Sequence, residues 1–197
     1  MKRVISIILL LSTVALYAHN PKYQQKATSK PISVIKDNGF YIGLGVGYFD
    51  LQNSTINEKL SSSIATAIVG YDLNSYLSIE ARYNQGITHL HYKGTTSKIL
   101  NSAYSNLAIY AKAGYPIKHL KPYILIGYGV NKISNLNGSD RVELSKQYGV
   151  GVSYKLNDNI SLFADYIRVY NKKGFDGRAV KDNLKAKLIT IGATYNF

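Results

Sequence analysis

Apolar and polar residues alternate along the chain from Gly39 to its end, in segments of about ten to thirteen residues. A period of two places every second side chain on the same face, which is typical of a β-strand with one apolar face. Clusters of Gly, Asn, Asp, Ser or Pro separate the segments and indicate turns. The pattern predicts eight strands, at residues 39–51, 61–73, 77–90, 103–115, 122–133, 143–156, 160–171 and 185–197.

The connections between these strands alternate in length. Short connections are expected at 74–75, 116–121 and 157–159, and longer ones at 52–60, 91–102, 134–142 and 172–184. Short turns at one end and longer loops at the other are typical of barrels in the bacterial outer membrane. We therefore expect an all-β fold over residues 39–197, an eight-stranded antiparallel up-and-down transmembrane β-barrel. Its first and last strands should pair, and both termini should face the periplasm of a Gram-negative cell.

The two faces of the predicted strands differ in the way that a membrane requires. The first strand alternates large apolar residues with small or polar ones: Phe40, Ile42, Leu44, Val46 and Tyr48 on one face, Tyr41, Gly43, Gly45 and Gly47 on the other. We interpret the apolar face as the exterior and predict a glycine-rich, polar interior. This is the reverse of a water-soluble barrel and argues against a lipocalin-like fold.

Two features refine this assignment. Six tyrosines are predicted to form an aromatic girdle near the periplasmic strand ends, namely Tyr71, Tyr83, Tyr115, Tyr154, Tyr166 and Tyr195. In the seventh strand, Arg168 shares the outer face with Leu162, Ala164 and Tyr166. Either a β-bulge or a position of Arg168 above the membrane would accommodate its charge.

The N-terminus has the layout of a secretory signal peptide. Lys2 and Arg3 precede an uncharged apolar run from Val4 to Leu16, and Ala18 is a suitable small residue for cleavage. The run is too short for a transmembrane helix, which needs about 20 apolar residues. We assign residues 1–18 to the signal peptide and residues 19–38 to a flexible periplasmic extension.

Composition narrows the possible chemistry. The chain has 197 residues and no Cys, which excludes disulfides, thiolate metal sites and a Cys nucleophile. Loss of Lys2 and Arg3 with the signal peptide lowers the formal charge from +13 to +11. Because the protein is expected to be secreted, nucleic acid is not an expected partner, and phosphate-rich lipid surfaces are the more natural counter-charge.

The two halves of the predicted barrel resemble each other. The segment GYDLNSYLSIEARY at 70–83 aligns with SYKLNDNISLFADY at 153–166. Tyr41 likewise aligns with Tyr123, each followed by two glycines at matching spacing. We interpret this as a four-strand unit used twice.

Four charged residues are predicted to face the interior: Glu80, Arg82, Lys112 and Asp165. Glu80 and Lys112 should lie at matched height on neighbouring strands and form the most direct pair. An eight-stranded barrel is only wide enough for side chains to fill it, and unpaired buried charge is costly. A structural ion-pair network is therefore the favoured interpretation, and a polar plug that opens into a small pore is the alternative.

Several segments together resemble the small OmpA/OmpX-type and opacity-type outer-membrane barrels, also called porin-family proteins. They are FYIGLGVGY, GYDLN, LSIEARY, KPYILIGYGV and the C-terminal ITIGATYNF. The resemblance covers the chain from about Gly39 to its end. It implies that Gly192, Tyr195 and Phe197 belong to a C-terminal signal read by the barrel-assembly machinery. The chain stops at the barrel, so a peptidoglycan-tethering function is not implied.

The sequence favours a structural or surface-interaction role: envelope integrity, adhesion or lipopolysaccharide contact. Basic residues expected at the outer end, chiefly Lys172, Lys173 and Arg178, are candidates for contact with lipopolysaccharide phosphates. Outer-membrane lipid and host or cell-surface molecules are the other expected partners. A low-conductance pore is the alternative function.

No catalytic, cofactor-binding or metal-binding residues are predicted. A lipid-modifying barrel enzyme is less favoured, because the His89-Leu90-His91 segment lacks the Ser that a local nucleophile would require. Two histidines alone also do not make a metal site.

Overall fold

The computed structural model describes residues 39–55, 58–94, 97–136, 138–175 and 178–197. The predicted signal peptide and the extension at 19–38 lie outside these residues. The strands are β1 Gly39–Asn53, β2 Glu58–Asp72, β3 Leu77–Gly86, β4 Leu90–Lys93, β5 Ser97–Leu100, β6 Ala103–Gly114, β7 Leu120–Leu136, β8 Ser139–Lys155, β9 Ile160–Phe175 and β10 Arg178–Asn196. No helix among the described residues has the length and apolar character needed to cross a membrane.

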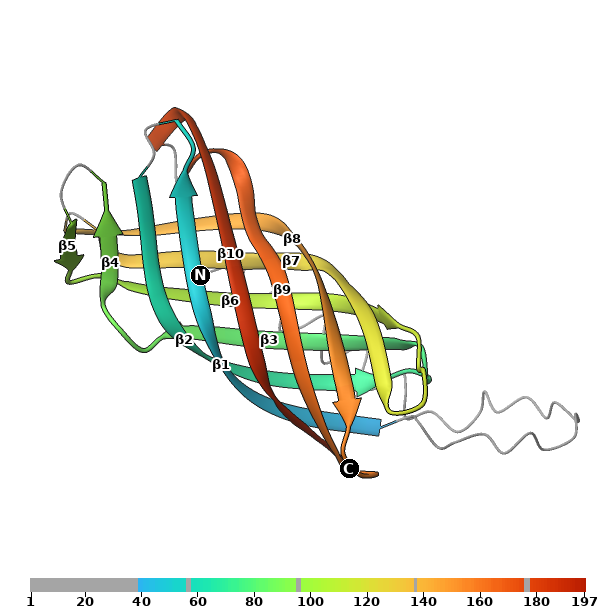
Figure 1. Ribbon diagram of the computed structural model, residues 1–197. Helices are drawn as coiled ribbons and strands as arrows, with labels where there is room; N and C mark the ends of the chain where they lie inside the picture. The colour runs from blue at the N-terminus through green and yellow to red at the C-terminus, as the bar shows by residue number, and fades with distance from the viewer. Residues whose placement is uncertain (1–38, 56–57, 95–96, 137, 176–177) are drawn as a thin grey trace, which may run out of the picture. The chain divides into compact units, whose positions relative to one another are not determined.

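Eight of the strands close into an antiparallel barrel in the order β1-β2-β3-β6-β7-β8-β9-β10 (Figure 1). The barrel closes because β1 pairs on both sides. It pairs with β2 from Gly39↔Asp72 to Asn53↔Glu58 and with β10 from Tyr41↔Asn196 to Asn53↔Leu184. The predicted fold and the predicted pairing of the first and last strands are confirmed.

The two ends of the barrel differ. We call the end that holds the connections 73–76, 115–119 and 156–159 the turn end. Gly39 and Phe197 also lie there, and the Phe197 amide donates a 3.1 Å hydrogen bond to the Phe40 carbonyl. We call the opposite end the loop end. Six of the eight barrel strands, all except β3 and β6, run further toward it than predicted. β9 extends to Phe175 and β10 begins at Arg178, so most of the predicted connection 172–184 is strand. Backbone pairing continues there although the side chains no longer alternate between apolar and polar.

The predicted connection 91–102 contains a hairpin formed by β4 and β5. The third strand was predicted to span residues 77–90. The predicted end was wrong, because β3 ends at Gly86. The chain leaves the barrel wall at residues 87–89, where Ser62 Oγ donates a 2.8 Å hydrogen bond to the Thr88 carbonyl. β4 then pairs again with β2, at Lys59–Ser61.

Large apolar side chains cover the outside of the barrel, as predicted. On β1, the predicted exterior residues are exposed and Leu44 is 73% exposed, whereas Tyr41 is buried. Arg168 lies on the outer side of β9, and its Nη2 donates a 2.7 Å hydrogen bond to Tyr166 Oη. A register shift follows between the pairs Lys187↔Arg168 and Ala186↔Tyr170, so the bulge considered for this strand is present next to Arg168.

The tyrosine girdle was only partly correct. Tyr71, Tyr115, Tyr154 and Tyr195 lie close to the turns, as expected. Tyr83 and Tyr166 lie well inside their strands instead. In the cross-strand register, Tyr166 pairs with Ile189, which pairs with Tyr48. Tyr48 and Tyr166 therefore lie at the same level, further from the turns than the predicted girdle.

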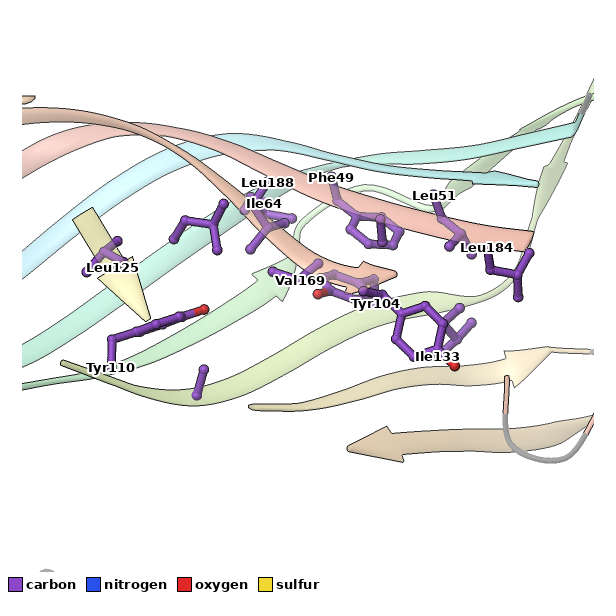
Figure 2. Close-up of a cluster of buried hydrophobic side chains, with 14 of the residues drawn as sticks. Phe49, Leu51, Ile64, Tyr104, Tyr110, Leu125, Ile133, Val169, Leu184 and Leu188 are labelled. Atoms are coloured by element: carbon purple, nitrogen blue, oxygen red, sulfur yellow. The ribbon is translucent and has the colours of Figure 1, made fainter. Parts of the chain in front are cut away.

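The interior was predicted to be polar and glycine-rich throughout, and this is wrong for its loop-end half. Inward-facing apolar side chains fill that half (Figure 2), among them Phe49, Leu51, Ile64, Tyr104, Leu184 and Leu188. The rings of Phe49 and Tyr104 stack with their centroids 3.6 Å apart. The inward positions of β1 change from glycine near the turn end to Phe49 and Leu51 near the loop end. The character of the interior therefore changes along one strand.

Candidate functional site

The four predicted interior charges meet between β3, β6 and β9. Lys112 Nζ lies 2.7 Å from Glu80 Oε1, and Arg82 Nη2 lies 2.7 Å from Glu80 Oε2. Arg82 Nη1 reaches across the interior to Asp165 Oδ2, also at 2.7 Å. The side chains of Glu80, Arg82 and Asp165 are at most 1% exposed, and that of Lys112 is 11% exposed. Two carboxylates and two cations balance each other, which is what burial of these groups requires.

Two tyrosines extend this network. Tyr41 Oη donates a 2.6 Å hydrogen bond to Glu80, and Tyr123 Oη donates a 3.0 Å hydrogen bond to Asp165. The Lys112 ammonium lies 4.3 Å from the centre of the Tyr123 ring, a favourable cation–π distance. Asp165 Oδ1 has no hydrogen-bond partner among the described residues.

Glycine makes both tyrosine contacts possible. Tyr41 pairs with Gly70, which pairs with Glu80. A Cβ on Gly70 would lie 2.2 Å from the Tyr41 ring, so the ring can cross β2 to reach β3 only because position 70 has no side chain. Tyr123 crosses Gly151 to reach Asp165 in the same way. Both halves of the barrel thus contain tyrosine, glycine and carboxylate on three successive strands. Only the tyrosines follow the sequence repeat, which aligns Gly70 with Ser153 and Glu80 with Phe163.

A row of polar side chains, which the sequence reading missed, lies on the loop-end side of the charges. Thr66 Oγ1 donates to Asn84, Asn84 Nδ2 donates to Asn106, and Asn106 Nδ2 donates to Asn131, at 2.8–3.1 Å. Asn131 Nδ2 then donates to Ser145 Oγ at 2.8 Å. We call these five residues the amide row. The sequence did contain an indication of this row. Three asparagines occupy inward-facing positions inside strands, where Asn is uncommon.

A cavity of about 430 Å³ opens at the turn end, on the other side of the charged network. Tyr41, Lys112, Phe163 and Thr194 are among its lining residues. The interior therefore has four successive zones from the turn end to the loop end: the cavity, the charged network, the amide row and the apolar core. Tyr110 also hydrogen-bonds to Gln147 between the network and the amide row.

The other predicted site residues lie away from the charged network. Lys172 and Lys173 are exposed on β9, and Lys172 Nζ lies 3.5 Å from Glu143 Oε1. Because they are consecutive in a strand, these two lysines point to opposite sides. The backbone of Arg178 pairs with Phe175, across the connection from the lysines. At the turn end, Gly192 lies in β10 opposite Gly45, and Tyr195 and Phe197 are exposed with their rings 5.2 Å apart.

His89 and His91 are exposed near the start of β4. Within the described ranges, no group of three or more His, Asp or Glu side chains is close enough to hold a metal ion.

Three comparisons place this barrel among known proteins. The solved structure of Neisserial surface protein A is 21% identical, with a TM-score of 0.61 over 81% of this chain and 97% of that one. Ail of Yersinia pestis, solved with the heparin analogue sucrose octasulfate, is 19% identical, with a TM-score of 0.56 over 82% and 99%. OprG of Pseudomonas aeruginosa is 14% identical, with a TM-score of 0.52 over 82% and 97%. These similarities show a shared fold.

Sequence comparison gives the family. The 25 kDa outer-membrane immunogenic protein of Brucella canis is 29% identical over 93 residues, so the match spans less than half of either chain, 44% of each. The model of the outer membrane protein β-barrel domain matches residues 6–197. This chain is therefore a member of the outer-membrane β-barrel domain family of Gram-negative bacteria.

Proposed function

We propose that this protein is a closed outer-membrane barrel with a structural and surface-interaction role, not a diffusion channel. The observation that carries the proposal is the continuous filling of the interior by the charged network, the amide row and the apolar core. A solute that entered the turn-end cavity would have to separate Arg82 from both carboxylates and then cross an apolar core. Both steps are energetically costly.

Conductance measurement tests this proposal directly. The protein is reconstituted into planar bilayers, with a known porin as the positive control. We expect no discrete current steps from the folded barrel. Reproducible steps that scale with the amount of folded protein would support the alternative, a low-conductance pore.

We further propose that the turn end, with both termini, faces the periplasm and that the loop end faces the medium. Turns at the inner end and longer segments at the outer end are the rule for such barrels. Epitope tags tested on intact cells distinguish the two orientations. A tag in the connection 137–138 should bind antibody without permeabilisation, and a tag in the connection 156–159 should not.

The partners proposed for the loop end are lipopolysaccharide and host or cell-surface molecules. Lys172, Lys173 and Arg178 remain our candidates for contact with lipopolysaccharide phosphates. The complex of Ail with a heparin analogue is a precedent, in a protein of the same fold, for binding of an anionic saccharide. The proposed role is not enzymatic and requires no cofactor. Gly192, Tyr195 and Phe197 are proposed to serve the barrel-assembly machinery.

A further inference from the structure

Basic residues gather on one part of the barrel's outer face, near the loop end. The cross-strand register aligns two adjacent rows of outward side chains over β9, β10, β1, β2 and β4. The first row runs Arg168, Lys187, Asp50, Ser61 and His91, and the second runs Asn171, Lys185, Gln52, Lys59 and Lys93. We call these ten residues the basic face.

The basic face lies directly beyond the apolar belt. The next outward row toward the turn end contains Tyr166, Ile189 and Tyr48, which pair in that order. The following outward row, one step closer to the turn end, contains Ala164, Ile191 and Val46. A molecule lying along these strands would therefore meet aliphatic side chains, then tyrosines, then cations. This is the order of acyl chains, interface and headgroup phosphates in a lipid.

The charge of the basic face is not neutralised within it. Asp50 is its one carboxylate and is buried between two lysines, 2.7 Å from Lys59 Nζ and 3.8 Å from Lys187 Nζ. The face contains five Lys or Arg side chains, so subtracting one carboxylate leaves a formal charge of +4. In the part of the chain that the structure describes, no carboxylate forms an ion pair with Lys93, Arg168 or Lys185.

The β4–β5 hairpin turns one end of this face into a pocket. The pocket has a volume of about 470 Å³ and is lined by Tyr48, Lys59, Ser61, His91, Tyr92, Lys93 and Ile99. Lys59 and Lys93 are cross-strand partners, so both ammonium groups border the same space. The Tyr48 ring and the Ile99 side chain, which is 64% exposed, form an apolar part of the pocket wall next to the two ammonium groups. The pocket thus combines phosphate-binding groups with apolar surface.

We propose that the basic face binds the phosphorylated sugar headgroup of an outer-leaflet glycolipid of the lipid A type, with its acyl chains on the apolar belt. One phosphate occupies the pocket beside Lys59 and Lys93, and a second lies near Lys185, Lys187 and Arg168. The cations extend across five strands, which at about 4.8 Å between strands is about 19 Å. One phosphate cannot contact both ends of such a face, whereas a disaccharide with two phosphates can. This inference rests on the proposed orientation of the loop end toward the medium.

The test uses a local fluorescence signal. Because the chain has no Cys, an Ile99→Cys variant can carry an environment-sensitive dye at the pocket. An Ile126→Cys variant is the control, since Ile126 is 62% exposed on β7, on the opposite wall of the barrel. Each dye-labelled variant is placed in phosphatidylcholine nanodiscs and titrated with bisphosphorylated or dephosphorylated lipid A. We expect a salt-sensitive response at position 99 to the bisphosphorylated lipid only, and no such response at position 126.

Charge variants identify the site. The double variant Lys93→Gln with Lys185→Gln should bind bisphosphorylated lipid A about 30-fold more weakly, because each cation near a lipid phosphate contributes about 1 kcal/mol. The affinity is read from the titration at position 99. The charge-matched control, Lys118→Gln with Lys155→Gln at the turn end, should leave it unchanged. Folding of every variant is checked by the heat-dependent shift in gel mobility. Equal responses to the two lipids, or no effect of the Lys93 and Lys185 changes, would overturn the inference.

The same assay separates this site from the Lys172, Lys173 and Arg178 contact. Neutralising those three residues should leave the signal at position 99 within a few-fold of its original affinity. Antibody access to the loop end of intact cells tests the orientation independently. If the fluorescence response is absent while the orientation is confirmed, only the lipid site on the basic face is rejected, and the proposed orientation stands.

Discussion

Glu80 shows how a single residue organises the centre of the barrel. Its two carboxylate oxygens accept contacts from Lys112, Arg82 and Tyr41. Substitution by Ala leaves Arg82 buried with only Asp165 as its partner. Removing one member of a buried ion pair typically costs about 3–5 kcal/mol. We expect Glu80→Ala to lower the free energy of unfolding by about 3 kcal/mol in a urea titration of the protein in lipid vesicles.

An exposed ion pair provides the control for this measurement. Asp158 lies 3.1 Å from Lys155 but its side chain is 98% exposed, and such pairs contribute about 0–1 kcal/mol. Asp158→Ala should therefore change stability little. A loss for Glu80→Ala no larger than the loss for Asp158→Ala would show that the interior network does not stabilise the barrel.

At the scale of the strands, the arrangement of tyrosine, glycine and carboxylate joins three neighbours on each side of the barrel. In Gly151→Ala, the new Cβ would lie 2.5 Å from the Tyr123 ring. The ring would have to move away from Asp165, and overpacking of this kind costs about 1–3 kcal/mol. We expect a corresponding loss of stability in the same urea titration. Gly39→Ala is the control, since its Cβ would meet only the Phe197 carbonyl at 3.4 Å. Equal stability of the two variants would contradict this explanation.

The last strand also carries the proposed assembly signal. Phe197 is 75% exposed and contacts Tyr195 by an edge-on ring packing. Because it buries little surface within the barrel, deletion of Phe197 should reduce the amount of folded protein in the outer membrane while the purified barrel remains almost as stable. Heat-modified gel mobility of outer-membrane fractions measures the first effect, and urea titration measures the second.

Phe40→Ala is the matched control for this deletion, because Phe40 is a second exposed aromatic residue at the turn end. If both changes reduced assembly equally, loss of a lipid-facing aromatic ring would be the cause, and the assembly signal would be rejected.

At the scale of the whole molecule, the sequence predicted the strands better than the interior. Contact with lipid imposes alternation on every spanning strand, so the eight strands and their outer faces could be identified. β4 and β5 have only four residues each, too few for a reliable alternation. The alternation of inward and outward positions along each strand identified the inward charges, including Glu80 and Arg82. It could not identify their exact partners, because each tyrosine contact depends on a glycine in the strand between the tyrosine and the carboxylate.

The change from a polar to an apolar interior was also missed, since inward positions were assigned one character along the whole strand. Phe49 and Leu51 already break that rule in the sequence. The amide row was missed because Asn is more usual in turns than in strands, and only the closed barrel brings Asn84, Asn106 and Asn131 together.

The closed interior makes a final prediction about water access. Thr194 and Thr190 both point inward from β10, but Thr194 lines the turn-end cavity whereas Thr190 is only 1% exposed beside the charged network. Since the chain has no Cys, Thr194→Cys and Thr190→Cys form a matched pair with a small change of volume. A charged, membrane-impermeant thiol reagent should label position 194 quickly and position 190 only after unfolding, as measured by mass spectrometry of the protein in vesicles. Rapid labelling of both positions in the folded barrel would mean that water crosses the network, and the protein would then have to be regarded as a pore.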